Sequence, residues 1–315
     1  MKAVTITEDN EIAVKQREAP ETSVGEVLVQ IYAAGMNNAD VMQKMGGYPA
    51  PVDAPADIPG LEFAGEIVEI GPETERFSVG DHVMGLVSGG AQAEIIAVNE
   101  RFLMSMPSSL SWEAAGSFPE AFITAHDALT AKANLRPGER VLITGAAGAV
   151  GVAAVQIAKL IGAEVIASVR NPDTREATNN LGADEVIAPD DMEKYGPYDV
   201  ILELIGAADF EANIDALNYQ GRIVCIGFMS GTEANVDISK LAFKQAAVYG
   251  RALRKRPKEG KATAIRAVEK EVLPFVEKSE ITVPIHATYS LDEAEKAYED
   301  YNKKGKFGQI VLVNQ

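Results

Sequence analysis

The sequence is poor in residues that build disulfides and metal centres. Among its 315 residues it has one cysteine, Cys225, and three histidines, His82, His126 and His286. One cysteine can form neither a disulfide nor a cysteine-built metal site within the chain, and its apolar surroundings favour a small buried hydrophobic residue. The histidines are scattered without ligand spacing, so we interpret them as ordinary core or surface residues.

Long hydrophobic runs are also lacking, and acidic residues outnumber basic ones. No apolar stretch approaches the roughly 20 residues that span a bilayer, and residues 1–6 are too polar to begin a signal peptide. The formal net charge of −17 should repel nucleic acid and anionic membranes. We therefore expect a cytoplasmic protein that binds neither. One basic patch, residues 251–258, is either a solvated loop or a place where an anionic ligand is captured.

A cluster of small residues interrupts an apolar segment near the middle of the chain. Residues 140–151 begin as a strand-like run and end in glycine and alanine, and apolar residues resume at 152–161. This pattern predicts a strand, a tight turn and a helix. Gly145 and Gly148 would allow the turn and the close approach of a phosphate, and Gly151 would lie where helix and strand pack together.

The first turn of that helix is a candidate phosphate site. Its unpaired N–H groups, including those of Ala149 and Val150, would hold a pyrophosphate with the help of the helix dipole. The spacing Gly-x-x-Gly-x-x-Gly departs from the commoner Gly-x-Gly-x-x-Gly, so the motif needs support from its surroundings.

The following residues give that support. Further short β-rich runs, most of them separated by helical or polar segments, lie at 164–169, 184–188, 199–204, 222–226 and 247–252. Near-continuous apolar strands alternating with helices indicate a parallel sheet covered on both faces, and six strands match a complete doubly wound dinucleotide fold. The predicted class is therefore α/β.

The chain has room for two domains, since 47% of its residues are hydrophobic. Residues 1–120 contain short strand-like pieces separated by turn residues, which predicts a compact, partly barrel-like β domain. A helix capped by Ser111 and a second helical segment at 121–129 would join this β domain to the dinucleotide domain, residues 121–259. The segment 260–315 would then complete the first domain, because its final strand has no place in the six-stranded sheet.

Several motifs identify a family resemblance. They lie at 36–43, 47–49, 59–65, 89–93, 119–125, 145–151 and 305–310. With these the chain resembles the zinc-independent quinone oxidoreductases of the medium-chain dehydrogenase/reductase superfamily, most closely the p53-inducible type. The resemblance implies a GroES-like β domain, a Rossmann domain inserted before its C-terminal part, and a homodimer in which strand 247–252 pairs with its twin.

The resemblance also implies chemistry without a metal. Zinc-dependent members of the superfamily hold a catalytic metal with a cysteine and a histidine, where this chain has Asn37 and Leu61. Neither residue replaces those ligands. Without a Lewis acid an alkoxide would not be stabilised, whereas a quinone or an α,β-unsaturated carbonyl accepts hydride more readily. The cofactor would lie across the carboxyl ends of the strands, with the nicotinamide between the domains.

Substrate and nicotinamide contacts follow from the same resemblance. Asn37 and Tyr48 would donate hydrogen bonds to the acceptor oxygen; the alternative is a turn-stabilising asparagine and a packed tyrosine. Thr124, at the start of the helix leading into the dinucleotide domain, and Gly227 and Phe228, after the fifth strand, would contact the nicotinamide. Thr124 could instead only cap or pack, and Phe228 could only pack. Asp40 and Glu62 would brace the cleft.

The end of the second strand predicts a preference for NADPH over NADH. An NAD site normally has an acidic residue there, whereas this chain has Ser168, Arg170 and Asn171. Arg170 could clamp a 2′-phosphate, Ser168 and Asn171 could donate to it, and Arg175 could help. Two departures from relatives are Thr174 in place of a lysine and Ala188 or Pro189 in place of a tyrosine.

Two other functions stay open. An enone or 2-alkenal reductase would share every cofactor feature, and nothing between Gly46 and Pro59 distinguishes its substrate cleft from that of a quinone reductase. A non-catalytic NADPH-binding protein, like some crystallin-type relatives, would bind the cofactor without consuming it.

Overall fold

The computed structural model of the protein describes residues 1–314, so Gln315, the last residue of the predicted segment 260–315, lies outside it. The chain forms two compact units. Unit 1 contains residues 1–120 and 253–304 and the described residues from Gln309 onward, and unit 2 contains residues 121–252 and 305–308.

Unit 2 is built on a six-stranded sheet in which every pairing is parallel. Its strands are β8 (Arg140–Ile143), β9 (Glu164–Ser168), β10 (Glu185–Ile187), β11 (Tyr198–Glu203), β12 (Leu217–Cys225) and β13 (Ala247–Gly250). Their order, β10-β9-β8-β11-β12-β13, is that of a doubly wound dinucleotide fold. The predicted sheet is confirmed, with β12 starting earlier than expected.

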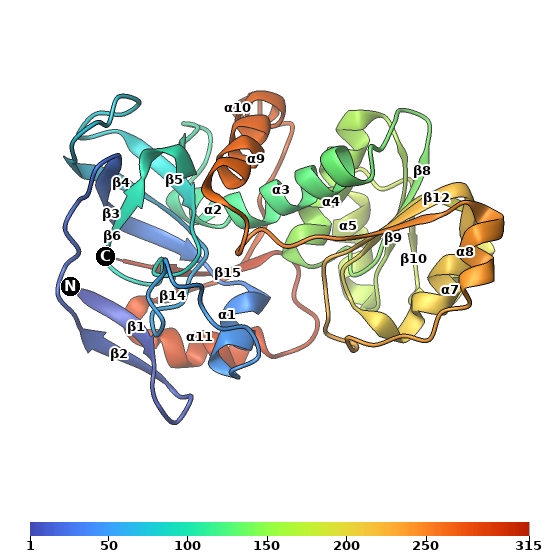
Figure 1. Cartoon of the computed structure of the whole chain (residues 1–315), viewed down its shortest axis with the longest axis horizontal. Helices are drawn as coiled ribbons and strands as arrows, with labels where there is room; N and C mark the ends of the chain where they lie inside the picture. Colours follow the sequence, from blue (N-terminus) through green and yellow to red (C-terminus); the bar gives the residue numbers. More distant parts are fainter. Residues whose placement is uncertain (315) are drawn as a thin grey trace. The chain divides into compact units, whose positions relative to one another are not determined.

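Helices cover the sheet of unit 2, which explains why its central strands are apolar throughout. The helical segments are α3 (Pro119–His126), a π-helix (Asp127–Lys132), α4 (Ala149–Ile161), α5 (Arg175–Asn179), α6 (Met192–Tyr195), α7 (Phe210–Asp215), α8 (Ile238–Lys244) and short 3₁₀ turns at 172–174, 189–191 and 207–209. In Figure 1 the strands run between α4 and α5 on one side and α7 and α8 on the other.

Unit 1 is β-rich, as predicted. Its strands are β1 (Lys2–Ile6), β2 (Ile12–Gln16), β3 (Glu26–Gly35), β4 (Glu62–Ile70), β5 (His82–Leu86), β6 (Ile95–Asn99), β7 (Leu103–Ser105), β14 (Ile285–Ser290) and β15 (Gln309–Val313). β1 and β2 form a hairpin, and the others form one sheet in which β15 pairs with β3 and β14. The tail therefore returns to the first unit, as predicted.

The helices of unit 1 flank this sheet. They are α1 (Asn38–Lys44), α2 (Trp112–Gly116), α9 (Lys258–Glu271), α10 (Leu273–Glu277), α11 (Ala294–Tyr301) and 3₁₀ turns at 100–102 and 291–293. Ser111 caps α2, because its hydroxyl accepts a hydrogen bond from Ala114 N at 3.3 Å. The core of the sheet is made of apolar side chains, with Val27, Ile31 and Phe63 fully buried.

Candidate functional site

The glycine turn of unit 2 connects β8 to α4 at the carboxyl edge of the parallel sheet. Gly145 has a φ of 60°, in the left-handed region. A Cβ on Gly151 would lie 2.5 Å from Ala146 Cα, so only glycine lets the helix pack this closely on the turn. Segment 305–308 joins the turn, where Gly308 N donates to Ala147 O at 3.4 Å.

The first turn of α4 presents backbone donors. Gly148 is its N-cap, and the first helical bond runs from Val152 N to Gly148 O at 2.8 Å. The N–H groups of Ala149, Val150 and Gly151 precede that bond and have no acceptor within the helix. Gly148 is exposed and its two successors are half-exposed, so an anion can reach these donors. These residues fit the pyrophosphate of a dinucleotide.

The end of β9 places only part of the predicted 2′-phosphate site at the surface. Arg170 is exposed, and no residue among 1–314 pairs with its guanidinium. Ser168 is 4% exposed. Asn171 caps a 3₁₀ turn, accepting from Asp173 N at 3.2 Å, and Arg175 Nε donates to Val169 O at 3.2 Å. Arg170 is therefore the side chain of this group that is most available to a phosphate.

Glu203 organises the end of β11 and was missed by the sequence reasoning. This carboxylate is 2% exposed. Its Oε1 accepts from Thr144 Oγ1 at 3.0 Å, Ile205 N at 2.6 Å and Gly206 N at 2.9 Å, and its Oε2 accepts from Asn213 Nδ2 at 2.8 Å. It ties the glycine turn to the loop after β11. The only signal for it in the sequence was a lone glutamate inside an apolar run.

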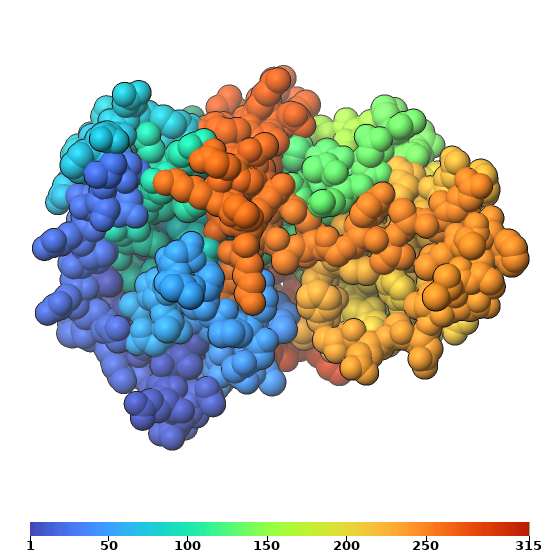
Figure 2. All heavy atoms as spheres, in the orientation of Figure 1, coloured from blue at the N-terminus to red at the C-terminus, as the bar shows by residue number. Residues whose placement is uncertain are grey.

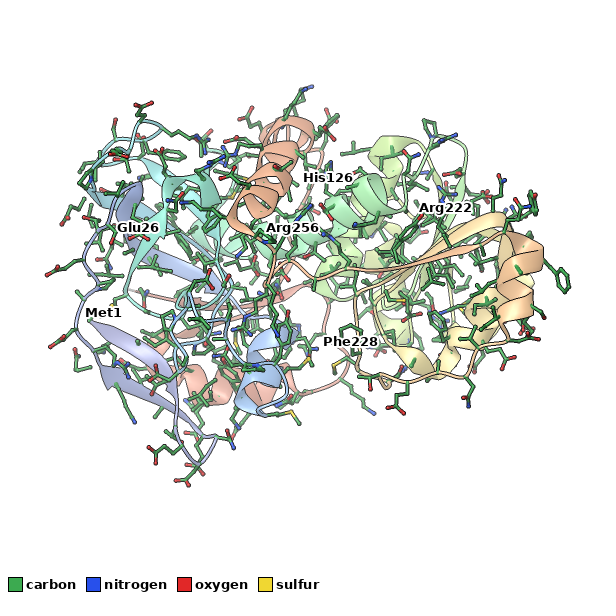
Figure 3. The ribbon with its side chains drawn as sticks, viewed as in Figure 1. Met1, Glu26, His126, Arg222, Phe228 and Arg256 are labelled. Atoms are coloured by element: carbon green, nitrogen blue, oxygen red, sulfur yellow. The ribbon has the colours of Figure 1, made fainter. Side chains whose placement is uncertain are left out.

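The three predicted nicotinamide contacts lie in different settings. A Cβ on Gly227 would lie 1.8 Å from Leu204 O, so this loop approaches the end of β11 too closely for any side chain. Phe228, on the loop after β12, is 48% exposed and is not a core residue (Figure 3). Thr124 was expected to open its helix, but it lies buried in the last turn of α3, which begins earlier at Pro119.

In unit 1, Asp40 is a buried carboxyl that organises the start of α1. Its Oδ2 accepts from Asn37 N at 2.8 Å and from Gln92 Nε2 at 3.2 Å, and its Oδ1 accepts from Gly60 N at 3.0 Å. Burial raises the pKa of Asp40 to about 6, against the effect of these donors. Asp40 therefore braces the two segments that carry Asn37 and Gly60.

Glu62 is a second buried carboxyl and holds the side chain of Asn37. Asn37 Nδ2 and Gln309 Nε2 donate to Glu62 Oε1 at 2.8 and 3.2 Å, and Glu120 N donates to Oε2 at 2.8 Å. A Cβ on Gly35 would lie 2.5 Å from Oε1, so glycine makes room for the carboxyl. Burial raises the pKa of Glu62 to about 8. One N–H of the predicted Asn37 donor is thus already engaged.

Tyr48 packs against a basic cluster. The guanidinium of Arg254 lies 5.1 Å from the centre of its ring and Lys255 Nζ lies 5.9 Å from it. Arg254 also donates to Ser88 O at 2.8 Å, to Tyr48 O at 2.9 Å and to Gln43 Oε1. Burial raises the pKa of the Tyr48 hydroxyl, while Arg254 opposes this shift. The hydroxyl is therefore protonated at neutral pH and can donate.

Two arginines of the basic patch at 251–258, which was interpreted as either a solvated loop or an anion site, have side chains that are buried and bonded to other parts of the chain. Arg254 is 5% exposed, and Ser88 Oγ donates to its carbonyl oxygen at 3.0 Å. The Arg251 and Asp127 side chains form a buried ion pair in unit 2. Only parts of this segment, such as Lys255, are exposed. The sequence could not show this because the partners lie far away along the chain.

Cys225 lies at the end of β12, half-buried against the hydrophobic cluster of unit 2. Burial, with a contribution from Glu203, raises the pKa of its thiol to about 11. It is therefore a thiol rather than a reactive thiolate at neutral pH.

The donor set of unit 1 does not fit a catalytic zinc ion. Leu61 has no donor atom, Asn37 offers an amide, and a zinc site of this kind takes three protein ligands from Cys, His, Asp or Glu. Within residues 1–314 no group of three or more such side chains could hold a metal ion. His82 packs on Trp112, with ring centres 4.7 Å apart.

The last strand of unit 2 has one open edge. β13 pairs with β12 alone among the described strands, and its Val248 and Tyr249 are 41% and 38% exposed. Ile238 and Phe243 on the neighbouring α8 are 75% and 81% exposed. Figure 2 shows the orange atoms of this helix at the surface. An open edge beside exposed apolar side chains can pair with another chain.

Two family models match the chain, the "Alcohol dehydrogenase GroES-like domain" over residues 23–108 and the "Zinc-binding dehydrogenase" over residues 149–270. With the observed sheets, these matches confirm the predicted pairing of a GroES-like domain and a six-stranded dinucleotide-binding fold.

Several individual proteins are similar to the chain. "Quinone oxidoreductase-like protein 2" of Mus musculus is 30% identical over 71% of this chain and 67% of its own length. "Acryloyl-coenzyme A reductase" of Metallosphaera sedula is 28% identical over 99% of this chain and 100% of its own. "Polyketide synthase GfsB" of Streptomyces halstedii is 33% identical over 92% of this chain, which spans only 5% of that protein. The solved quinone oxidoreductase of Pseudomonas syringae pv. Tomato DC3000 is 26% identical, with a TM-score of 0.88 and 99% of each chain covered.

Proposed function

Because the chain belongs to the medium-chain dehydrogenase/reductase superfamily, we propose that it transfers a hydride from NADPH to a quinone without a metal ion. It is an NAD(P)-dependent oxidoreductase, as its family models and relatives indicate. The quinone as acceptor rests on relatives named quinone oxidoreductase or quinone oxidoreductase-like. The choice of NADPH and the metal-free mechanism rest on the residues of this chain.

Unit 2 is the proposed NADPH-binding domain. The N–H groups of Ala149, Val150 and Gly151 would hold the pyrophosphate, and the exposed Arg170 would hold the 2′-phosphate. No carboxylate stands at Ser168 or Asn171 to repel that phosphate. Thr124, Gly227 and Phe228 are the proposed nicotinamide contacts. When bound, NADPH supplies the hydride.

Unit 1 is the proposed substrate domain. An acceptor that gains a hydride develops negative charge on its oxygen, which hydrogen-bond donors stabilise. Asn37, held by Glu62, and Tyr48, held by Arg254, are the proposed donors. The final proton would come from the Tyr48 hydroxyl or from water.

One observation carries the proposal furthest. Where a zinc site would need ligands, Asn37 Nδ2 donates to Glu62 Oε1 at 2.8 Å, and the adjacent Leu61 has no donor atom. The amide and the carboxyl bond to each other instead of presenting a set of three ligands. Such a site suits an acceptor that is already electron-poor, because a quinone needs no Lewis acid to accept a hydride.

The second candidate is reduction of an enone or 2-alkenal. It is favoured by the similarity, over almost the whole chain, to a protein named acryloyl-coenzyme A reductase. This reaction would use the same cofactor residues and the same two donors, and it would differ in the shape of the acceptor.

The test is an oxygen-free rate comparison with NADPH on ortho-quinones, para-quinones and straight-chain enones. We expect the highest kcat/KM with a quinone. Faster turnover of an enone would favour the second candidate. Binding of NADPH without its oxidation by any acceptor would contradict both enzymatic functions and indicate a binding protein.

We further propose a homodimer in which β13 pairs with its twin along the open edge. The exposed apolar side chains of β13 and α8 would be buried in that interface. We also place the protein in the cytoplasm. Among residues 1–314 no helix is long and apolar enough to cross a membrane.

A further inference from the structure

Unit 1 contains a cavity that takes no part in the proposed reaction. Its volume is about 240 Å³, and it is lined by Arg76, Arg101, Ala262, Thr263 and Arg266. Three of the five lining residues are arginines, although the whole chain has a formal net charge of −17. The cavity therefore concentrates positive charge in an acidic protein.

The three arginines around the cavity form ion pairs with only two carboxylates. The guanidinium groups of Arg76 and Arg266 both pair with Glu269, the former at 3.2 Å, and both donate to the same carbonyl oxygen, Leu103 O. The two cations therefore share one carboxylate. Arg101 has a carboxylate of its own, Glu259, which accepts two hydrogen bonds from it at 2.7 and 2.6 Å. Three guanidinium groups thus form ion pairs with two carboxylates, while the nearby carboxylate of Glu100 accepts from the backbone N–H of Arg76 at 2.8 Å.

Burial and the neighbouring charges act strongly on Arg266. Its Nε is buried and, within the described chain, has no hydrogen-bond acceptor. Burial lowers the pKa of Arg266 to about 10, and the positive charges of Arg76 and Arg101 act in the same direction, while Glu269 opposes them. Three positive charges close together cost free energy, which an anion in the cavity would offset.

We propose that this cavity binds a small oxyanion bearing a phosphate group. Guanidinium groups bind phosphate oxygens in pairs of parallel hydrogen bonds, and three of them line the space. A volume of about 240 Å³ lies below the usual range of pockets for drug-sized ligands and suits the free ion or a short phosphate ester. All of the lining residues belong to unit 1, and the site is separate from the glycine turn of unit 2. This inference does not depend on the proposed function.

Thr263 allows a test that leaves the arginines in place. It is exposed on α9, and its hydroxyl bonds only to the Glu259 carbonyl oxygen of its own helix, so its replacement should not disturb folding. Thr263→Glu adds a carboxylate to the lining of the cavity and should repel an anion there. Thr263→Gln is the matched control, because glutamine is similar in size to glutamate and carries no charge.

The measurement is calorimetric titration of the full-length protein with inorganic phosphate at constant ionic strength. The parent and Thr263→Gln should bind in a saturable way, and Thr263→Glu should bind about tenfold more weakly or not at all. Arg76→Gln should also weaken binding, whereas Arg17→Gln, which removes an exposed arginine elsewhere in unit 1, should not. Tighter binding of glycerol phosphate than of inorganic phosphate would identify an ester as the occupant, and equal binding would identify the free ion.

Two results would overturn the proposal. The first is no saturable binding of phosphate by the parent at millimolar concentrations. The second is equal binding by the parent, Thr263→Glu and Arg76→Gln, which would place the phosphate elsewhere on the chain.

Discussion

Replacing Glu62 by glutamine should change how the stability of the protein depends on pH. Glu62 is fully buried, and burial raises its pKa from 4.5 to about 8. Between these values the folded protein keeps a proton that the unfolded chain has lost. The folded state then binds more protons than the unfolded state, so the free energy of unfolding must fall as the pH rises.

The size of the effect follows from the shift. Each pH unit within the window is worth about 1.4 kcal/mol, so the parent should lose about 3 kcal/mol between about pH 5.5 and pH 8 through this residue alone. Glutamine cannot ionise, and Glu62→Gln should lose none of this. The variant should be less stable at low pH by about 1–2 kcal/mol, because its amide cannot accept from all three N–H groups that surround Glu62. The two curves therefore cross as the pH rises, and at pH 8 the variant should be the more stable protein by about 1–2 kcal/mol.

The assay is chemical denaturation of the parent and Glu62→Gln across this pH range. The difference between them isolates Glu62, because Asp40, whose pKa is raised to about 6, is present in both. Glu69→Gln is the matched control, since Glu69 is exposed on the same strand, β4, and its variant should follow the parent. Parallel curves for the parent and Glu62→Gln would mean that Glu62 is ionised in the folded protein throughout, and would refute the reasoning.

Four other predictions concern the cofactor, a substrate donor, a buried arginine and the assembly. Arg170→Ala should raise the KM for NADPH much more than the KM for NADH. Equal changes in the two KM values would contradict the assignment of the 2′-phosphate site. Tyr48→Phe should lower kcat by less than about 100-fold, since a quinone is already activated, and an unchanged kcat would exclude Tyr48 as a donor. Arg254→Met should destabilise the protein by about 2 kcal/mol or more in denaturation, while the exposed Lys255→Met should cost less than about 0.5 kcal/mol. Light scattering should give a dimer, and a monomer at working concentration would contradict pairing through β13.

The fold was predictable because its signals are local. Apolar runs and glycine turns report strand, helix and turn one segment at a time, and six such runs predicted the parallel sheet of unit 2. The beginning of β12 was missed, because Asn218, Gln220 and Gly221 are typical of a turn. In the structure the pairing with β11 is irregular over this stretch, running from Tyr198 opposite Leu217 to Val200 opposite Arg222.

The contacts of the site were not predictable, because they join residues that are distant in the sequence. Asn37 was singled out as a donor, but its bond to Glu62 spans 25 positions, and that from Arg254 to Ser88 spans 166. Periodicity carries no information about such pairs. Burial likewise could not be read for Arg254, since a cluster of basic residues usually indicates a solvated surface. The sequence could therefore identify candidate site residues such as Asn37, but it could not identify their hydrogen-bond partners.

The most direct test of the central claim is the rate at which chelator-treated protein oxidises NADPH with a quinone in the absence of oxygen. Metal-free hydride transfer predicts the same rate before and after chelation, with one NADPH consumed for each quinone reduced. Activity that disappears on chelation and returns when zinc is added would contradict the account, because it would require a metal site that Asn37 and Leu61 do not build.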